Sequence, residues 1–235
     1  RINPAFAHFL IKYATSENDT ILDPFGGIGT IPAEGMLMGR NTISNDLNPY
    51  ANYISLAKSE KKANLDDLIS YINDIVVDTS NISLDEIPDW VKEYYNTDTL
   101  KEILFFKKKL EEDEQYFLLG NLIGISQGHR PGHLSKPCAW TLPYKPRPDD
   151  PGEYREVKCR LIEKIKRTYK DSFEQKGTMK VIHGDARSLA VDDNSVDAII
   201  SSPPYFDTLD YVNSSRLRLA ICGYYDEEKK KGIKD

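Results

Sequence analysis

The chain has 235 residues, of which 40% are hydrophobic and 29% are charged, and its formal net charge is −6. This composition suits a globular protein with one large domain, or one domain with a long insertion. The acidic balance argues against nucleic-acid binding through overall charge, although phosphate contacts depend on the local field of a cleft. No apolar run is long enough to span a bilayer, and the first residues lack a signal-peptide pattern.

Cysteine usage indicates a reducing compartment, so a cytoplasmic location is the default expectation. The three cysteines, Cys138, Cys159 and Cys222, are scattered and odd in number, which argues against a disulfide framework. The sequence has no C-x-x-C spacing that would suggest a metal site. His129 and His133 have i, i+4 spacing, but a Pro-Gly pair between them argues against a helix and hence against a zinc pair.

The N-terminal part of the chain reads as a strand–loop–helix–strand unit of the doubly wound kind. A short helix over residues 3–14 is expected first, with an apolar stripe. A buried strand follows at 20–23, then a glycine-rich loop and a helix over 31–38, with Pro32 in its first turn and Gly39 at its end. A second strand over 41–45 ends at Asp46.

The middle of the chain loses this alternation and is expected to be a mostly helical insertion over residues 59–177. Helices are predicted over 49–62 and 65–77, and another begins at a Thr99–Glu102 capping box and runs through Leu119. Residues 120–152 read as an extended loop rich in Gly and Pro. An amphipathic helix then places basic residues beside its exposed face from Arg155 to Lys170.

Regular structure returns in the C-terminal part. Strands are expected over 179–185 and 196–201, the latter apolar enough to be buried on both faces. A helix over 208–222 is expected to follow. We find no internal repeat in the sequence.

The loop Asp23-Pro24-Phe25-Gly26-Gly27-Ile28-Gly29-Thr30 is the first chemical signal. Its glycines permit a close approach of a ligand to the backbone, and Asp23 can accept from a cationic or donor group. Asp46, at the end of the next strand, stands where an acidic residue binds a ribose diol in such folds. The spacing is not G-x-G-x-x-G, so pyrophosphate binding is the weaker interpretation, and a tight turn without a ligand is the alternative.

Ser202-Pro203-Pro204-Tyr205 is the second signal, because it can activate an amino group on a flat substrate. The Ser202 hydroxyl and the Pro203 carbonyl can each accept a hydrogen bond from one N–H of an exocyclic amine. These bonds pull the nitrogen toward tetrahedral geometry, so that its lone pair is no longer delocalised into the ring. Tyr205 offers a face for stacking, which suits a base extruded from a duplex. The alternative is a Pro-Pro turn that caps a strand beside a packed tyrosine.

In this order, the two signals resemble the cofactor and catalytic motifs of S-adenosylmethionine-dependent DNA amino-methyltransferases. Residues 23–30 look like motif I of that family, residues 45–48 resemble its ribose-binding motif, and His183-Gly184-Asp185-Ala186 resembles its adenine-binding position. Asn3-Pro4-Ala5-Phe6 fits its N-terminal segment near the methionine part of the cofactor. Ser202 in the first position resembles enzymes that methylate N4 of cytosine, whereas Asp is usual for N6 of adenine.

The resemblance implies S-adenosyl-L-methionine as the cofactor and duplex DNA with a flipped base as the substrate. Cofactor-binding residues are then expected to be Pro4, Asp23, Pro24, Phe25, Gly26, Gly27, Gly29, Thr30, Asp46, Leu47, Asp185 and Ala186. The catalytic residues would be Ser202, Pro203, Pro204 and Tyr205. Phe206 and Tyr211 are candidate walls of the base pocket, and His129 and Arg130 are candidate backbone contacts. A cognate restriction endonuclease or second subunit would fit as a partner.

The implied fold is a Rossmann-like class I methyltransferase sheet with a large, mostly helical insertion. Residues 1–58 and 178–235 would form the cofactor-binding catalytic core, and residues 59–177 would be a candidate target-recognition region. The family's sheet has seven strands and this sequence shows four, so we expect an incomplete sheet. Two alternatives stay open: an RNA base methyltransferase, and a non-catalytic DNA-binding subunit that retains the fold.

Overall fold

A computed structural model describes residues 2–61, 63–128, 130, 132–138, 145–146, 152–170, 174–205 and 211–224 of the chain. The chain divides into two compact units, which are described separately. The sheet unit contains residues 1–61 and 173–208, and the helical unit contains residues 62–172 and 209–235. None of the described helices is long and apolar enough to cross a membrane.

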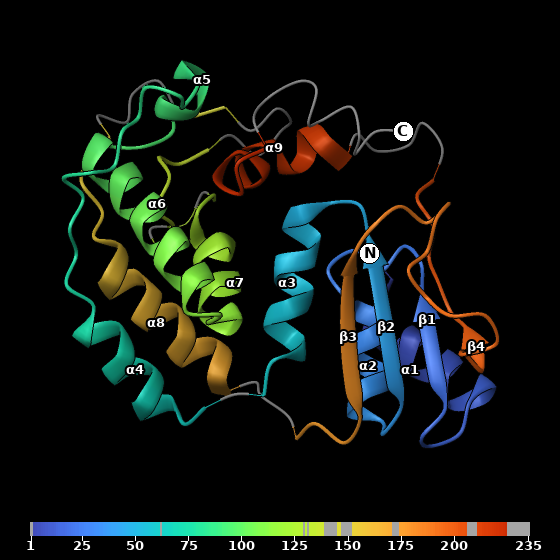
Figure 1. The fold of residues 1–235 in the computed structure, drawn as a ribbon. Coiled ribbons are helices and arrows are strands. Elements are labelled where there is room, and N and C mark those ends of the chain that lie inside the picture. Colours follow the sequence, from blue (N-terminus) through green and yellow to red (C-terminus); the bar gives the residue numbers. More distant parts are fainter. Residues whose placement is uncertain are drawn as a thin grey trace. The chain divides into compact units, whose positions relative to one another are not determined.

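The sheet unit is a parallel α/β structure (Figure 1). Its helices are α1 (Pro4–Ala14), α2 (Thr30–Leu37) and α3 (Pro49–Ser59), and its strands are β1 (Thr20–Asp23), β2 (Asn41–Asp46), β3 (Thr178–His183) and β4 (Ala198–Ile199). The strand order is β3-β2-β1-β4. This is the α/β class with a parallel sheet and many helices that the sequence predicts for a Rossmann-like methyltransferase.

Short polar signals start the first and third helices of this unit. The Asn3 side chain accepts from the Ala5 N–H, and Pro4 occupies the first turn of α1. The Asn48 side chain caps α3 in the same way. Asparagine is a favoured N-cap because its carbonyl oxygen accepts an orphan N–H of the first turn.

A small apolar core joins both ends of the sequence beneath the sheet. Ala7, Ile11, Ile21, Ile31 and Ile200 are at most 8% exposed and pack together. They come from α1, β1, α2 and the residue after β4, so the N-terminal helix and the segment that leads to Ser202 share one core. Removing these side chains from water is the main favourable contribution that holds β4 beside β1.

The glycine loop after β1 passes close to β2. The Gly26 N–H donates to the Asn45 carbonyl at 2.9 Å, and a Cβ at Gly26 would lie inside van der Waals contact of Ser44 Oγ. The Ser44 hydroxyl is itself buried without a hydrogen-bond partner. Glycine is therefore required at position 26 by a neighbouring strand, independently of any ligand.

The strand predicted over 196–201 is shorter and more exposed than expected. The structure assigns only Ala198–Ile199 to β4, and Ile199 is 65% exposed. The prediction of burial on both faces is wrong here because, among the described strands, β4 pairs with β1 alone and lies at an edge of the sheet.

The helical unit is formed by α4 (Leu65–Asp74), α5 (Asp89–Lys92), α6 (Thr97–Glu112), α7 (Tyr116–Ile125), α8 (Val157–Lys170) and α9 (Tyr211–Ile221). Its core is made by fully buried side chains, among them Ile72, Ile103, Phe106, Leu118 and Ile165. The α7 helix is apolar all round and nearly every residue in it is buried, as expected for a central helix.

Three predictions for this unit are corrected. The helix predicted to run through Leu119 is broken at Glu114, whose φ of 53° cannot continue a helix, and α7 begins afterwards. Residues 120–125, predicted as loop, belong to α7, because burial of Leu122 and Ile123 outweighs the low helix propensity of the glycines. Asn96, and not Thr99, caps α6.

The α9 helix packs with the helical unit, whereas the sequence grouped residues 178–235 with the catalytic core. Arg216 stacks over Trp90 at 4.8 Å from the ring centroid and donates to the Tyr94 hydroxyl at 2.8 Å. Arg218 donates to the Gln127 carbonyl at 3.0 Å, and Leu217 between the two arginines is fully buried. These contacts explain the grouping of α9.

The fit of Gly26 against β2 gives a testable stability difference. We expect Gly26→Ala to lower the free energy of unfolding by roughly 2 kcal/mol or more, because its Cβ overlaps Ser44. A second substitution, Ser44→Ala, should return part of that loss. Gly27→Ala is the matched control, since only its positive φ is strained and its cost should be about 1 kcal/mol. Urea unfolding of the wild type and these three variants measures this, and equal losses at positions 26 and 27 would contradict the packing account.

Candidate functional site

The two sequence motifs lie side by side at the carboxyl edge of the sheet. Parallel pairing places Ile21 opposite Ala198 and Leu22 opposite Ile199. The Ile200 N–H donates to the Leu22 carbonyl at 3.1 Å. One residue further, the Ser201 hydroxyl donates to Asp23 Oδ1 at 2.7 Å. The Ser202–Tyr205 tetrapeptide therefore begins directly beside the first residue of the glycine loop.

This position is the topological switch point of the sheet. The chain moves from β1 to β2 and β3 on one side, and then returns to place β4 on the other side of β1. In open α/β sheets, ligands bind in the crevice at the carboxyl ends of the strands where the order reverses. Both motifs lie at the strand ends where this reversal occurs.

Asp23 is a buried carboxylate with a strongly perturbed titration. It is 2% exposed, and burial raises its pKa from the ordinary value of 3.8 to about 6, with a smaller contribution from the negative charge of Asp46. The hydrogen bonds from Ser201 and from the Phe25 N–H oppose this shift. A buried anion with raised pKa is suited to receive a cationic ligand group, whose charge would offset the cost of desolvation.

The glycine loop uses its own N–H groups inside the protein. Besides the Gly26–Asn45 bond, the Gly27 N–H donates to Asp46 Oδ2 at 2.7 Å and the Gly29 N–H donates to the Gly26 carbonyl at 2.8 Å. A pyrophosphate-binding loop keeps such N–H groups for its ligand. With Asp23 and Asp46 beside it, this loop is chemically unsuited to a phosphate, in agreement with the spacing argument from the sequence.

Gly27 marks the side of the loop that a ligand can approach. Its φ is 54°, and a Cβ built at this position would meet nothing within 4 Å. Gly26 and Gly29, in contrast, face neighbouring side chains. Within the described part of the chain, residue 27 is therefore open on the side toward which a Cβ would point.

Asp46 joins the glycine loop to the end of β2. Its second oxygen accepts from the Asn48 N–H at 2.8 Å, and burial raises its pKa, while His183 lowers it. His183 also contacts the Leu47 carbonyl, with 3.0 Å between Nε2 and the oxygen. Each carboxylate oxygen can accept a further hydrogen bond, so Asp46 retains the capacity to bind a diol.

Sequence reasoning missed the residues of α3 that hold the loop from the opposite side. Ser55 Oγ donates to the Gly27 carbonyl at 3.0 Å, and Lys58 Nζ donates to the Ile28 carbonyl at 2.6 Å. Ser55 and Lys58 lie in the second half of α3 and belong to no sequence motif, so only the fold reveals their contacts with the loop. The loop is thereby fixed before any ligand binds.

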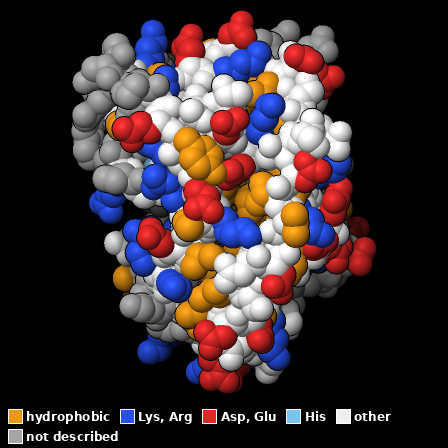
Figure 2. All heavy atoms as spheres, turned by 90° about the vertical axis from the view of Figure 1, so that its left-hand side faces the viewer, with side chains coloured by type: hydrophobic (Ala, Val, Ile, Leu, Met, Phe, Trp, Pro, Cys, Tyr) orange, Lys and Arg blue, Asp and Glu red, His pale blue; other side chains and the backbone are white. Residues whose placement is uncertain are grey.

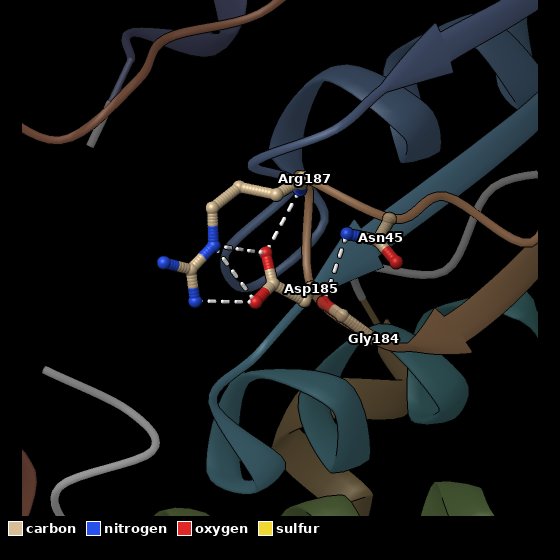
Figure 3. Close-up of polar contacts among 4 residues, drawn as sticks. All are labelled: Asn45, Gly184, Asp185 and Arg187. Atoms are coloured by element: carbon tan, nitrogen blue, oxygen red, sulfur yellow. Dashed lines mark hydrogen bonds and ion pairs between the residues drawn. The ribbon is translucent and has the colours of Figure 1, made fainter. Parts of the chain in front are cut away.

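Asn45 was also missed, although it stands inside a recognised motif. Its side-chain amide donates to the Pro24 carbonyl at 3.1 Å and to the Gly184 carbonyl at 3.0 Å, the second bond being visible in Figure 3. It therefore links the loops that follow β1 and β3 across the end of β2. Asn45 is a positioning residue in this site.

Asp185 follows β3, at the strand end expected from the sequence, but its carboxylate already has a partner. Arg187 Nε and Nη2 both donate to it, the shortest distance being 2.7 Å (Figure 3). Hydrogen bonding to Arg187 lowers the pKa of Asp185. An adenine amino group would have to share this carboxylate with Arg187, a contact that no sequence motif indicates.

The Ser202–Tyr205 tetrapeptide is accessible. Ser202 is half-buried, whereas Pro203, Pro204 and Tyr205 are exposed, Tyr205 to 68%. The aromatic ring is thus available as a stacking surface and is not a packed core residue in the described part of the chain.

The remaining predicted site residues have different positions. Phe25 in the glycine loop is 41% exposed, Thr30 begins α2 and Pro4 lies in the first turn of α1. Ala186, next to Asp185, and Pro24 are half-buried. Arg130 is exposed in the helical unit, in the segment after α7. Phe206 and His129 lie outside the described residues, as does the side chain of Tyr211.

Comparisons with known proteins agree with the motifs. Residues 1–59 match the profile of the DNA methylase family for N6 and N4 methylation. The chain is also 26% identical over a 269-residue alignment to the Type II methyltransferase M.BsoBI of Geobacillus stearothermophilus, which covers 93% of this chain. Both findings support the predicted resemblance to the DNA amino-methyltransferase family.

The alignment covers 50% of M.BsoBI, so the chain spans about half the length of this curated relative. No solved structure gave a significant match. The profile match ends with α3 and therefore includes the glycine loop, Asp46 and the two α3 residues that hold the loop.

The raised pKa of Asp23 predicts a characteristic pH dependence of stability. The carboxyl titrates near 3.8 in the unfolded chain and near 6 in the folded chain, so the folded state binds more protons between these values. The contribution of this group to stability therefore falls as the pH rises through this window. Asp23→Asn removes the charge but keeps an acceptor for Ser201.

We expect the free energy of unfolding of Asp23→Asn to rise relative to the wild type as the pH increases from about 4, with a gain of about 3 kcal/mol above pH ~6. Denaturant unfolding of both proteins at a series of pH values measures the difference. A difference that does not change with pH would show that Asp23 titrates normally.

Proposed function

We propose that this chain carries the cofactor and catalytic motifs of a DNA amino-methyltransferase that transfers a methyl group from S-adenosyl-L-methionine to an exocyclic amine of a flipped base. The observation that supports this most strongly is the Ser201–Asp23 hydrogen bond, which joins the two motifs at the switch point of the sheet. A cofactor beside Asp23 and a base above Ser202 would then occupy adjacent ends of β1 and β4.

The residues present fit this cofactor. A buried carboxylate at Asp23 suits a positively charged donor, and Asp46 retains acceptor capacity for a ribose diol. The uncovered backbone at Gly27 leaves room for a ligand between them. When bound, S-adenosyl-L-methionine supplies an electrophilic methyl group.

The protein's own contribution is to orient the amine. The Ser202 hydroxyl and the Pro203 carbonyl each accept a hydrogen bond from one N–H of this amine, so the nitrogen moves toward tetrahedral geometry and its lone pair is no longer delocalised into the ring. Proline at 203 and 204 restricts the backbone, which keeps that carbonyl in place. Stacking on the exposed Tyr205 offsets the cost of extruding the base. Most of the acceleration would come from this positioning, because the amine can lose its proton after transfer.

We propose cytosine N4 as the target, in preference to adenine N6. This preference depends on Ser202 in the first position of the tetrapeptide, where the N6-adenine enzymes usually have Asp. The relative M.BsoBI is named as a Type II methyltransferase, which supports a restriction–modification setting with a cognate endonuclease, and with it a cytoplasmic location.

Variants of the tetrapeptide test the assignment. We expect Tyr205→Ala to reduce methyl transfer by roughly 10- to 100-fold, the value of one base stack, and Pro203→Ala to reduce it by about tenfold through a looser carbonyl. Neither should change the affinity for S-adenosylhomocysteine. Tyr13→Ala removes a tyrosine that is 84% exposed on α1 and serves as the control.

The measurement combines calorimetry with tritium transfer by the full-length protein to duplex DNA, single-stranded DNA and transfer RNA, followed by nucleoside analysis. N4-methylcytosine in duplex DNA is the expected product. Transfer to transfer RNA alone would replace DNA with RNA as the substrate, and cofactor binding without transfer to any substrate would indicate a non-catalytic subunit. Full activity of Tyr205→Ala would contradict its role.

A further inference from the structure

Two groups of basic residues in the helical unit differ in what they contact, and the first group is structural. Arg155 donates to the carbonyls of His133 and Ser135. Lys158 donates to the carbonyls of Asn73 and Ile75 at 3.1 and 2.8 Å, at the end of α4. These side chains hold the unit together, so their positive charge is not evidence of a nucleic-acid surface.

The second group converges on a cavity. Lys164 and Arg167 of α8 line a cavity of about 380 Å³ together with Arg130 and His133 of the segment after α7. Among the described residues that line it, none is acidic. Two elements far apart in the sequence thus present three cationic side chains and an imidazole to one hollow.

Glycines and one side-chain contact give the cavity its shape. The Lys164 stem lies 4.0 Å from where a Cβ of Gly124 would be, and Arg167 Nη2 lies 3.6 Å from the corresponding point at Gly132. The Thr168 hydroxyl donates to Asn121 Oδ1 of α7 at 2.8 Å, which fixes α8 against α7. Larger residues at 124 or 132 would fill the hollow.

Two observations bear on whether this cavity can hold an anion: the hydrogen bonding at the carboxyl end of α7, and the contacts of the arginines. The carboxyl end of α7 would repel an anion, but the Ile125 carbonyl is occupied by the Leu134 N–H at 2.9 Å. Within the described part of the chain, neither Arg130 nor Arg167 forms an ion pair, and Arg167 uses only Nε, toward the Glu163 carbonyl at 3.4 Å. The planar guanidinium donors can therefore serve a phosphate bidentately.

The cavity gathers positive charge locally in a chain whose net charge is −6. On the side of the helical unit where α4, α6 and α8 lie, the drawn Lys and Arg side chains are interspersed with Asp and Glu and with apolar patches (Figure 2). Such a face provides no continuous basic stripe. A backbone phosphate would thus need a local site that concentrates positive charge.

We propose that this cavity binds a phosphodiester of the DNA backbone, with Lys164 and Arg167 as its principal contacts. The assignment rests on the proposed function for the identity of the nucleic acid, and it gives Arg130 a specific role. Because a phosphate contact carries no sequence information, the site would anchor the DNA without selecting the target sequence.

The test uses the full-length protein with Lys164→Gln/Arg167→Gln and, as the matched control, Lys166→Gln, which removes an exposed charge from the same helix outside the cavity. Fluorescence anisotropy with a labelled duplex is recorded over a series of KCl concentrations. Each lost phosphate contact should make the slope of log affinity against log salt less negative by about 0.9. Calorimetry with S-adenosylhomocysteine and thermal unfolding accompany the titrations.

We expect the double variant to lose about one unit of salt slope and on the order of tenfold in affinity at low salt, with cofactor binding and unfolding unchanged, and Lys166→Gln to resemble the wild type. A double variant with the slope of the control would overturn the cavity assignment and leave the proposed function intact. A wild type that binds no DNA would overturn both. A reduced slope in a protein that transfers no methyl group would uphold the cavity and refute the proposed function.

Discussion

The parallel pairing of β4 with β1 is the constraint on which the rest of the site depends. Without it, the glycine loop and the tetrapeptide would be two unrelated turns separated by more than half of the sequence. The pairing is short, only two residues in register, and it is maintained by the core beneath it and by the Ser201–Asp23 hydrogen bond. Because the buried Asp23 carboxylate accepts this hydrogen bond, the position of the Ser202–Tyr205 segment depends on the charge of Asp23 in the loop.

The hydrogen bonds and the negative charges of the loop favour a cationic ligand group over a phosphate. The N–H groups of Gly26, Gly27 and Gly29 all donate within the protein, so none of them remains for a phosphate. Asp23 and Asp46 add negative charge in a desolvated place, where burial raises the pKa of both and the charge of Asp46 raises that of Asp23 further. A cation relieves that cost and an anion increases it. This arrangement is the reason we propose a positively charged donor, and not a pyrophosphate, as the ligand of this glycine-rich turn.

Much of this could be predicted from the sequence, because Gly, Pro and strand-end Asp residues have few structural alternatives. Periodicity located α1 and the first two strands of the sheet, and the motif order located the crevice. The sequence could not predict contacts made by side chains that belong to no motif. Examples are Ser55 and Lys58, which donate to the loop carbonyls, and Arg187, which donates to Asp185. Glu114 was missed because a positive φ at a non-glycine residue has no signature, and it divides the helix that periodicity had joined. Placing α9 required the buried contacts of two arginines.

The central claim is that a methyl donor and its acceptor meet at the adjacent ends of β1 and β4. A crystal structure of the full-length protein with S-adenosylhomocysteine tests it most directly. The account predicts the ligand over Gly27, with its amino acid portion toward Asp23, its ribose at Asp46 and its sulfur directed at the Ser202–Tyr205 segment. A ligand bound at another edge of the sheet, or with its sulfur turned away from β4, would contradict it.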